Sequence, residues 1–189
     1  MKSRKLVFIG DSLTECFDWQ GRFSEYDVMN LGIAGETVEG LLIRIDRIGS
    51  SIKNISSKGT APLRKRDCPL IIFIMTGINN IAMEDSDILK SYKKIVSELS
   101  SKFKDAVIVA QSILPVNLYW IDNDAIKEIN ERLKETANEF NAEYLDIFSL
   151  FIDSKGTPNS EYLLDDGVHL SDAGYDVWAK AVEGFLKGA

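Results

Sequence analysis

Five short apolar segments, rich in valine, isoleucine and leucine, recur along the chain and constrain its fold more than any other feature. They occupy residues 6–9, 28–31, 70–75, 106–110 and 143–147. Segments of this length and composition are typical of strands that are buried on both faces of a sheet. We therefore expect five strands, separated by long connections.

Amphipathic patterns fill those connections. Apolar side chains recur at spacings of three and four within residues 38–52, 88–103, 126–140 and 178–185, which is the helical period. Strands that alternate with helices imply right-handed crossovers and a parallel sheet. At 189 residues, the chain is predicted to form one α/β domain over residues 1–189.

Several candidate functional residues follow these strands. Ser12, Gly35 and Asn79 come after the first, second and third strands, and His169 lies in the long segment after the fifth. Ligands of open α/β sheets bind at the carboxyl ends of the strands, so we expect all four residues at one edge. His169 is the single histidine, and with a nearby aspartate it makes nucleophilic catalysis by Ser12 possible.

Four short motifs, in this order, carry a family resemblance. They are Gly10-Asp11-Ser12-Leu13, Asn30-Leu31-Gly32-Ile33-Ala34-Gly35, Gly77-Ile78-Asn79-Asn80 and Asp166-Gly167-Val168-His169. Together they resemble the sequence blocks of the GDSL, or SGNH, hydrolase family. The third block of that family usually reads Gly-x-Asn-Asp, so Asn80 replaces an aspartate here.

The resemblance implies a three-layer α/β/α sandwich with a five-stranded parallel sheet, of the flavodoxin-like SGNH type, and the activity of a serine esterase. It implies that Ser12 is the nucleophile and His169 the base. The family spacing Asp-x-x-His favours Asp166 as the carboxylate that orients the imidazole, and Asp165 is the alternative.

An oxyanion hole completes the predicted site. Negative charge develops on the carbonyl oxygen during acyl transfer, so hydrogen-bond donors must converge there. The resemblance assigns this role to the backbone N–H groups of Ser12 and Gly35 and to the side-chain amide of Asn79. The alternatives are an acyltransferase with the same triad and a ligand-binding protein without catalysis.

Two segments should shape substrate specificity, because they leave strands at the catalytic edge: residues 112–122 and 148–165. The first contains Asn117, Tyr119 and Trp120, which are candidates for the wall of the acyl or alcohol pocket. Packing of the two rings against the following helix is an equal alternative. The short loops favour acetyl to butyryl groups over long acyl chains.

Composition excludes several other functions. The net charge of -7 disfavours nucleic acid and anionic membranes as partners, so a small-molecule ester is the expected partner. No apolar segment approaches the roughly 20 residues that span a bilayer. The absence of a signal-peptide pattern favours a cytoplasmic location. The sequence does not decide the oligomeric state, and both a monomer and a homo-oligomer agree with it.

No cofactor or metal is expected. One histidine and dispersed carboxylates do not form a typical zinc site, and no glycine-rich dinucleotide motif follows a strand. Cys16 and Cys68 are expected to be free thiols. The basic residues of the segment 56–69 are expected to form a solvated connection away from the site: Lys58, Arg64, Lys65 and Arg66.

Overall fold

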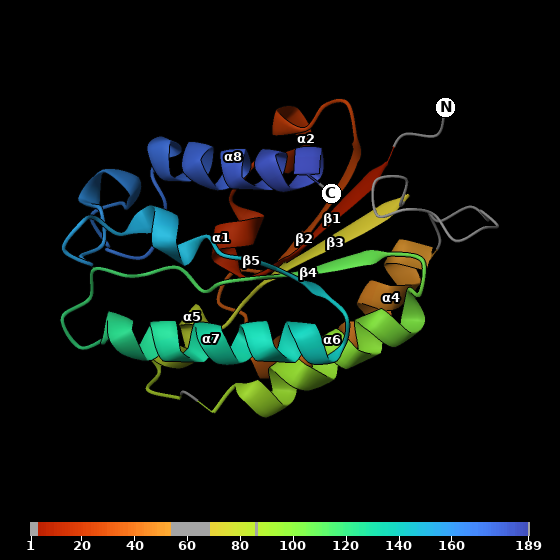
Figure 1. Cartoon of the computed structure of the whole chain (residues 1–189), viewed down its shortest axis with the longest axis horizontal. Helices are drawn as coiled ribbons and strands as arrows, with labels where there is room; N and C mark the ends of the chain where they lie inside the picture. Colours follow the sequence, from red (N-terminus) through yellow and green to blue (C-terminus); the bar gives the residue numbers. More distant parts are fainter. Residues whose placement is uncertain (1–3, 54–68, 86, 189) are drawn as a thin grey trace.

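A parallel sheet of five strands forms the centre of the molecule (Figure 1). The structure is a computed structural model, and it describes residues 4–53, 69–85 and 87–188. The strand order is β2-β1-β3-β4-β5. The strands are β1 (Lys5–Gly10), β2 (Asp27–Gly32), β3 (Leu70–Met75), β4 (Val107–Gln111) and β5 (Glu143–Leu145). The predicted five-stranded α/β fold is confirmed.

The central and edge strands differ in burial. Every residue of β1, β3 and β4 is buried, whereas β2 and β5 at the edges are partly exposed. Full burial on both faces therefore holds for the central strands only. The register pairs Gly10 of β1 with Gly32 of β2 and with Met75 of β3. These three strands consequently end level with one another.

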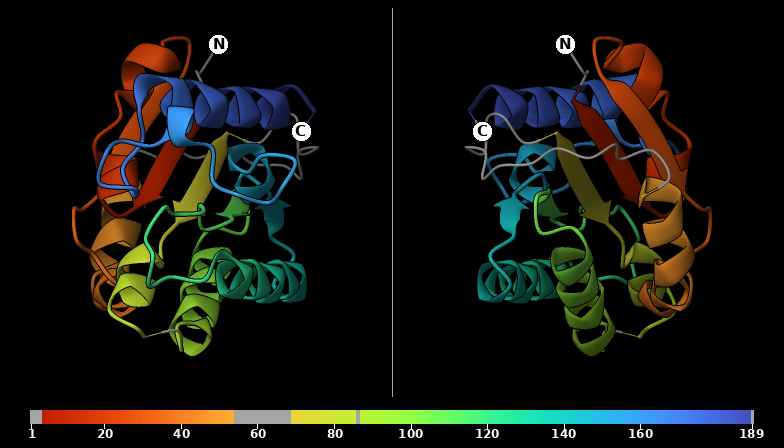
Figure 2. Two further views of the ribbon diagram at one scale, coloured as in Figure 1. Left: turned by 90° about the vertical axis from the view of Figure 1, so that its left-hand side faces the viewer. Right: turned by 90° about the vertical axis from the view of Figure 1, so that its right-hand side faces the viewer.

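Helices cover both faces of the sheet (Figures 1 and 2). On one face lie α2 (Trp19–Arg22) and α8 (Asp172–Gly188), and on the other lie α3 (Val38–Ile43), α4 (Ile45–Lys53), α6 (Leu89–Lys102) and α7 (Asn123–Glu139). The short helices α1 (Ser12–Glu15) and α5 (Ile78–Ala82) directly follow β1 and β3. The predicted three layers are present.

One helical prediction differs from the structure. The amphipathic run 38–52 forms two helices rather than one, because the chain turns at Arg44, which caps α3. The Arg44 guanidinium donates to the Leu31 carbonyl of β2 at 2.8 Å and to the Glu36 carboxylate. The break therefore places an arginine beside the end of β2.

Aromatic packing fixes the position of α1. Trp19 stacks on Phe8 and meets Trp178 of α8 edge to face. The Trp19 indole donates to the Thr14 carbonyl at 2.9 Å, and the Tyr175 hydroxyl donates to the Leu13 carbonyl at 3.0 Å. The core thus holds the first turn after β1 from two sides.

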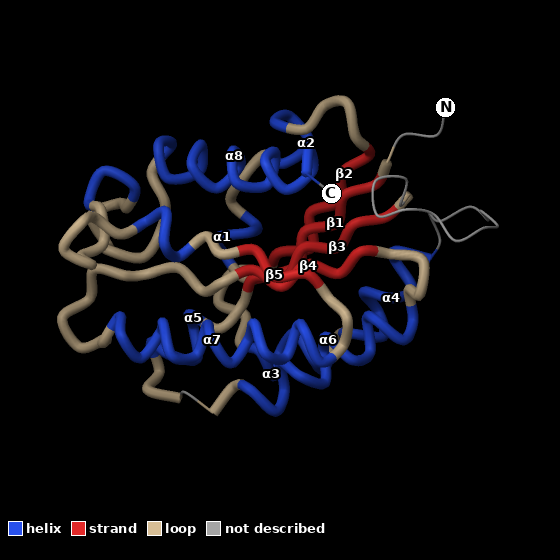
Figure 3. The backbone as a smooth tube through the Cα atoms, viewed as in Figure 1, coloured by secondary structure: helices blue, strands red, loops and turns tan. Residues whose placement is uncertain are grey.

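Loops gather at the carboxyl edge of the sheet (Figure 3). They include the segments after β4 and β5, and the latter contains the 3-10 turns η2 (Phe148–Phe151) and η3 (Ser160–Tyr162). No helix in the described part of the chain is long and apolar enough to cross a membrane. The predicted basic connection and Cys68 lie outside the described residues, whereas Cys16 is exposed with a free thiol.

Candidate active site

The carboxyl edge of the sheet brings together residues that lie far apart in the sequence. Ser12 opens α1 directly after β1, and Asn79 lies in α5 directly after β3. The Ile33 N–H donates to the Gly10 carbonyl at 3.0 Å, which ties the segment leading to Gly35 to the end of β1. His169 precedes α8 and reaches the same edge, where its ring meets Ser12.

Ser12, His169 and Asp166 form a hydrogen-bonded chain. The His169 Nε2 atom lies 3.0 Å from Ser12 Oγ, and His169 Nδ1 lies 2.7 Å from Asp166 Oδ2. An ionised carboxylate only accepts hydrogen bonds, so Nδ1 carries the proton and Nε2 accepts from the hydroxyl. Asp165 makes no such contact with the ring. These three hydrogen-bonded side chains have the geometry of a nucleophile, a base and an orienting carboxylate.

A tight turn holds the Asp166 carboxylate in place. Desolvation acts to raise its pKa, but the backbone N–H groups of Val168 and His169, at 2.9 and 2.8 Å, and the His169 ring hold that pKa below its usual range. Gly167 has a φ of +72°, and a side chain there would strike the Asn117 carbonyl. Glycine therefore permits the turn that aims both groups.

A second carboxyl group, that of Asp11, lies beside the serine and is only 1% exposed. Its Oδ1 atom accepts from the Leu13 N–H at 3.1 Å, so Asp11 caps α1. Burial raises the pKa of Asp11 to about 7, although the Leu13 hydrogen bond and the nearby His169 act against the rise. Asp11 consequently titrates close to the range usual for an imidazole.

Three hydrogen-bond donors near Ser12 retain free capacity. The backbone N–H groups of Ser12 and Gly35 donate to no residue that the structure describes. The Asn79 Nδ2 atom donates one hydrogen to the Glu36 carbonyl at 2.9 Å, which leaves its second hydrogen without an acceptor among these residues. Free donors are what an oxyanion hole requires.

The loop carrying Gly35 is fixed at several points. The Ala34 N–H donates to Glu15 Oε2 at 2.8 Å. The Glu36 carboxylate forms a bidentate pair with Arg44, at 2.5 Å for both contacts. Gly35 itself has a φ of +74°, which a residue with a side chain rarely adopts. Glu15, at the end of α1, therefore helps to fix this loop.

Sequence reasoning did not find the contribution of Glu36 and Arg44. Their pairing depends on the turn between α3 and α4. The two residues are eight positions apart in the sequence, a spacing that matches no known motif. Bidentate arginine–carboxylate pairs have a fixed geometry, and the Glu36 side chain is largely buried. The pair therefore orients the backbone that follows Gly35.

Asn80, which replaces the aspartate of the related block, is 2% exposed and makes three side-chain hydrogen bonds. Its Oδ1 atom accepts from the Val38 N–H at 2.9 Å, while its Nδ2 atom donates to Glu39 Oε2 at 2.7 Å and to Asp85 Oδ2 at 3.2 Å. An aspartate retains only the first bond, because an ionised carboxylate has no donor. The amide of Asn80 therefore supplies the two hydrogens that these acidic neighbours accept.

Changing Asn80 to aspartate should destabilise the protein by about 2–4 kcal/mol at pH 8, because two donors are lost and three carboxylates converge. These neighbours raise the pKa of the new carboxyl in the folded protein above its unfolded value. The part of the penalty that comes from ionisation is therefore absent below the unfolded pKa and complete above the folded one. Urea denaturation between pH 4 and pH 8 should show the difference from wild type shrinking as the pH falls.

Asn138→Asp is the matched control, since Asn138 is exposed on α7 and its change should cost less than about 0.5 kcal/mol. Equal stability of Asn80→Asp and wild type at pH 8 would contradict the assigned hydrogen-bond network.

The candidate pocket residues lie on the loop after β4. The Asn117 backbone N–H donates to the Gly167 carbonyl at 2.7 Å, which joins this loop to the turn between Asp166 and His169. Tyr119 is 97% and Trp120 is 50% exposed, and the two rings meet edge to face. Tyr119 is therefore not buried against α7, whereas half of the Trp120 side chain is covered. No described residue connects them to Ser12 by a hydrogen bond or ring contact.

The part of the chain that the structure describes contains no set of metal ligands. No group of three or more histidine, cysteine, aspartate or glutamate side chains there is placed to hold a metal ion.

The chain belongs to the GDSL-like Lipase/Acylhydrolase family, whose model matches residues 8–177. All four motifs and every residue of the Ser12–His169–Asp166 chain lie within this match. The predicted family resemblance is thereby confirmed.

Named relatives narrow the chemistry further. The chain is 27% identical over 194 residues to platelet-activating factor acetylhydrolase IB subunit alpha1 from Bos taurus, covering 98% of this chain and 76% of the relative. Together with the family, this relationship makes the protein an ester-hydrolysing enzyme.

Solved structures share the fold. One is a GDSL-like lipase from Bacteroides thetaiotaomicron, with a TM-score of 0.74, 19% identity and coverage of 98% of this chain and 88% of the other. Another is a catalytic mutant of the acetylxylan esterase Axe2 from Geobacillus stearothermophilus, with a TM-score of 0.72, 20% identity and coverage of 98% and 96%.

Proposed function

We propose that this enzyme is a serine esterase for short acyl groups, with Ser12 as the nucleophile. The observation that carries the proposal is the hydrogen-bonded chain from Ser12 Oγ through His169 to Asp166, at 3.0 and 2.7 Å. Its position at the carboxyl edge of a parallel sheet agrees with where such folds bind ligands.

Acylation begins with attack of Ser12 Oγ on the carbonyl carbon of the ester. The serine proton passes to His169 Nε2 as the new C–O bond forms, and Asp166 stabilises the resulting imidazolium through Nδ1–H. The tetrahedral intermediate then expels the alcohol, which takes the proton back from Nε2. The products of this half are an acyl-serine and a neutral alcohol.

Deacylation repeats these steps with water. His169 Nε2 removes one proton from the water as its oxygen attacks the acyl carbon, and the same proton returns to Ser12 Oγ when the acyl–serine bond breaks. The sum is one ester and one water converted to one carboxylic acid and one alcohol. The enzyme returns to its initial state.

Both tetrahedral intermediates place negative charge on the former carbonyl oxygen. The free N–H groups of Ser12 and Gly35 and the second amide hydrogen of Asn79 are the proposed donors to it. Donors fixed before the reaction stabilise the intermediate more than mobile water does. The loop contacts of Ala34 and Glu36 supply that rigidity.

The preference for short acyl groups rests on the loops and on the relatives. The segment after β4 is tied to the catalytic turn by Asn117, and its rings lie exposed rather than covering a long apolar channel. Two of the similar proteins are named an acetylhydrolase and an acetylxylan esterase. Both names point to the acetyl group.

Turnover of p-nitrophenyl esters tests the proposal. We expect kcat/KM to be highest between acetyl and butyryl and to fall toward chains of ten carbons, since long chains find no pocket in which each CH₂ adds about 0.8 kcal/mol of binding. Added alcohol should not divert the acyl group. A steady rise through decanoyl would overturn the short-acyl preference, and alcohol-dependent product would favour acyl transfer.

Trp120→Ala locates the acyl pocket. If this ring forms one wall, the butyryl-to-acetyl ratio of kcat/KM should fall by roughly three- to tenfold, because the ring supplies part of the contact with two CH₂ groups that are worth about 0.8 kcal/mol each. Tyr119→Ala is the comparison, because Tyr119 is almost fully exposed. An identical chain-length profile in Trp120→Ala and wild type would remove Trp120 from the pocket.

A further inference from the structure

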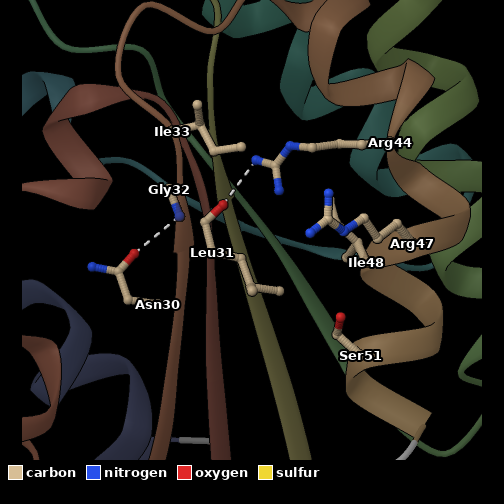
Figure 4. A pocket seen from close by; sticks show the side chains of 8 residues that line it. All are labelled: Asn30, Leu31, Gly32, Ile33, Arg44, Arg47, Ile48 and Ser51. Atoms are coloured by element: carbon tan, nitrogen blue, oxygen red, sulfur yellow. Dashed lines mark hydrogen bonds between the residues drawn. The ribbon is translucent and has the colours of Figure 1, made fainter.

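A pocket separate from the Ser12 site lies between the end of β2 and helix α4 (Figure 4). Its volume is about 250 Å³, it is open to solvent on one side, and its lining includes Leu31, Ile33, Arg44, Arg47, Ile48 and Ser51. None of the proposed catalytic residues lines it. The pocket therefore needs an explanation of its own.

Two arginine side chains line this pocket, and among the described residues only Arg44 is paired with a carboxylate. Arg44 is paired with Glu36 through Nε and Nη2, and no described residue accepts a hydrogen bond from its Nη1 group. Arg47 makes no hydrogen bond or ion pair with any residue that the structure describes. Figure 4 shows both side chains extending from the helical side toward β2. Among the residues that the structure describes, the Arg47 charge thus has no counterion, in a protein whose net charge is -7.

The remaining lining suits a small anion rather than a second protein side chain. The Ser51 hydroxyl projects from the next turn of α4 and makes no hydrogen bond within the described chain. Leu31, Ile33 and Ile48 supply apolar walls. Arginine groups recognise phosphate through two parallel N–H bonds, and a hydroxyl adds a further donor.

We propose that this pocket binds a phosphate group, as inorganic phosphate or as a small phosphate monoester, through Arg47, the free Nη1 of Arg44 and the Ser51 hydroxyl. A tetrahedral dianion offers more acceptor oxygens than a carboxylate and uses donors from all three side chains. The apolar walls accommodate a short carbon substituent. The site does not depend on ester hydrolysis, so binding can be tested without turnover.

Titration with inorganic phosphate at constant ionic strength, followed by amide NMR shifts, tests the site. We expect saturable shifts at Gly32, Ile33 and Arg47 with a dissociation constant on the order of 1 mM. Arg47→Gln should weaken binding at least tenfold. Arg132→Gln removes one exposed charge on α7, far from the pocket in the fold, and should leave binding unchanged.

Parallel titrations distinguish the ligands. Methyl phosphate should bind as tightly as inorganic phosphate or more tightly, and acetate at least tenfold more weakly. Equal affinity for acetate would make this a general anion site and overturn the phosphate assignment. Shifts that do not saturate, or that persist unchanged in Arg47→Gln, would remove the site altogether.

Discussion

Replacing Ser12 with alanine should lower kcat/KM for p-nitrophenyl acetate by about 10⁴–10⁶-fold, the range found when a nucleophile of this type is removed. The His169–Asp166 pair remains, but no hydroxyl is left at 3.0 Å from Nε2 to form the acyl-enzyme. Ser12 is half-buried, and within the described part of the chain its hydroxyl bonds only to His169. The fold should therefore survive the change, which circular dichroism and thermal unfolding would verify.

Covalent labelling separates the role of Ser12 from a general effect on the site. A fluorophosphonate should add to Ser12 in the wild-type enzyme, as peptide mapping by mass spectrometry would show, and should not add to Ser12→Ala. His169→Ala should lose similar activity, and the double variant should lose little more, because the two residues act as one unit. Esterase activity of Ser12→Ala equal to that of wild type would exclude Ser12 as the nucleophile.

The central features of the fold could be predicted because they depend on local pattern. Apolar runs such as that of β3, flanked by amphipathic segments, specify buried strands and crossover helices almost irrespective of tertiary contacts. The edge of the sheet at which Ser12, Gly35 and Asn79 meet follows from strand direction alone. The parallel fold and the family are confirmed, while the catalytic roles of these residues stay predictions.

Features that depend on contacts across the fold were not predictable. The turn at Arg44 interrupts an amphipathic pattern that continues on both sides, and the reason lies in Leu31 and Glu36. In the same way, Asn80 could be recognised as a departure, but its partner Glu39 becomes visible only when α3 lies beside α5, and its partner Asp85 only when the chain turns back after α5. The half-burial of β2 and β5 follows from their positions at the edges of the sheet. The order of the strands in the sheet was not predicted from the sequence.

Asn79 supplies the side-chain donor of the proposed oxyanion hole and also bonds to the loop that carries Gly35. Its loss should therefore have the second largest effect on activity. Asn79→Ala should lower kcat by about 10²–10³-fold and change KM much less, because the donor acts mainly in the transition state. The same substitution also removes the bond to the Glu36 carbonyl, which raises the question whether looser positioning of Gly35 causes the loss.

Glu36→Gln answers that question, because it weakens the pair with Arg44 while keeping both the Asn79 amide and the backbone carbonyl that accepts from it. If the amide hydrogen itself stabilises the oxyanion, Asn79→Ala should lose at least tenfold more kcat than Glu36→Gln. Steady-state kinetics of both variants with p-nitrophenyl acetate gives the comparison. Equal losses would assign Asn79 to the support of the loop, and a change confined to KM would place it in substrate binding rather than in catalysis.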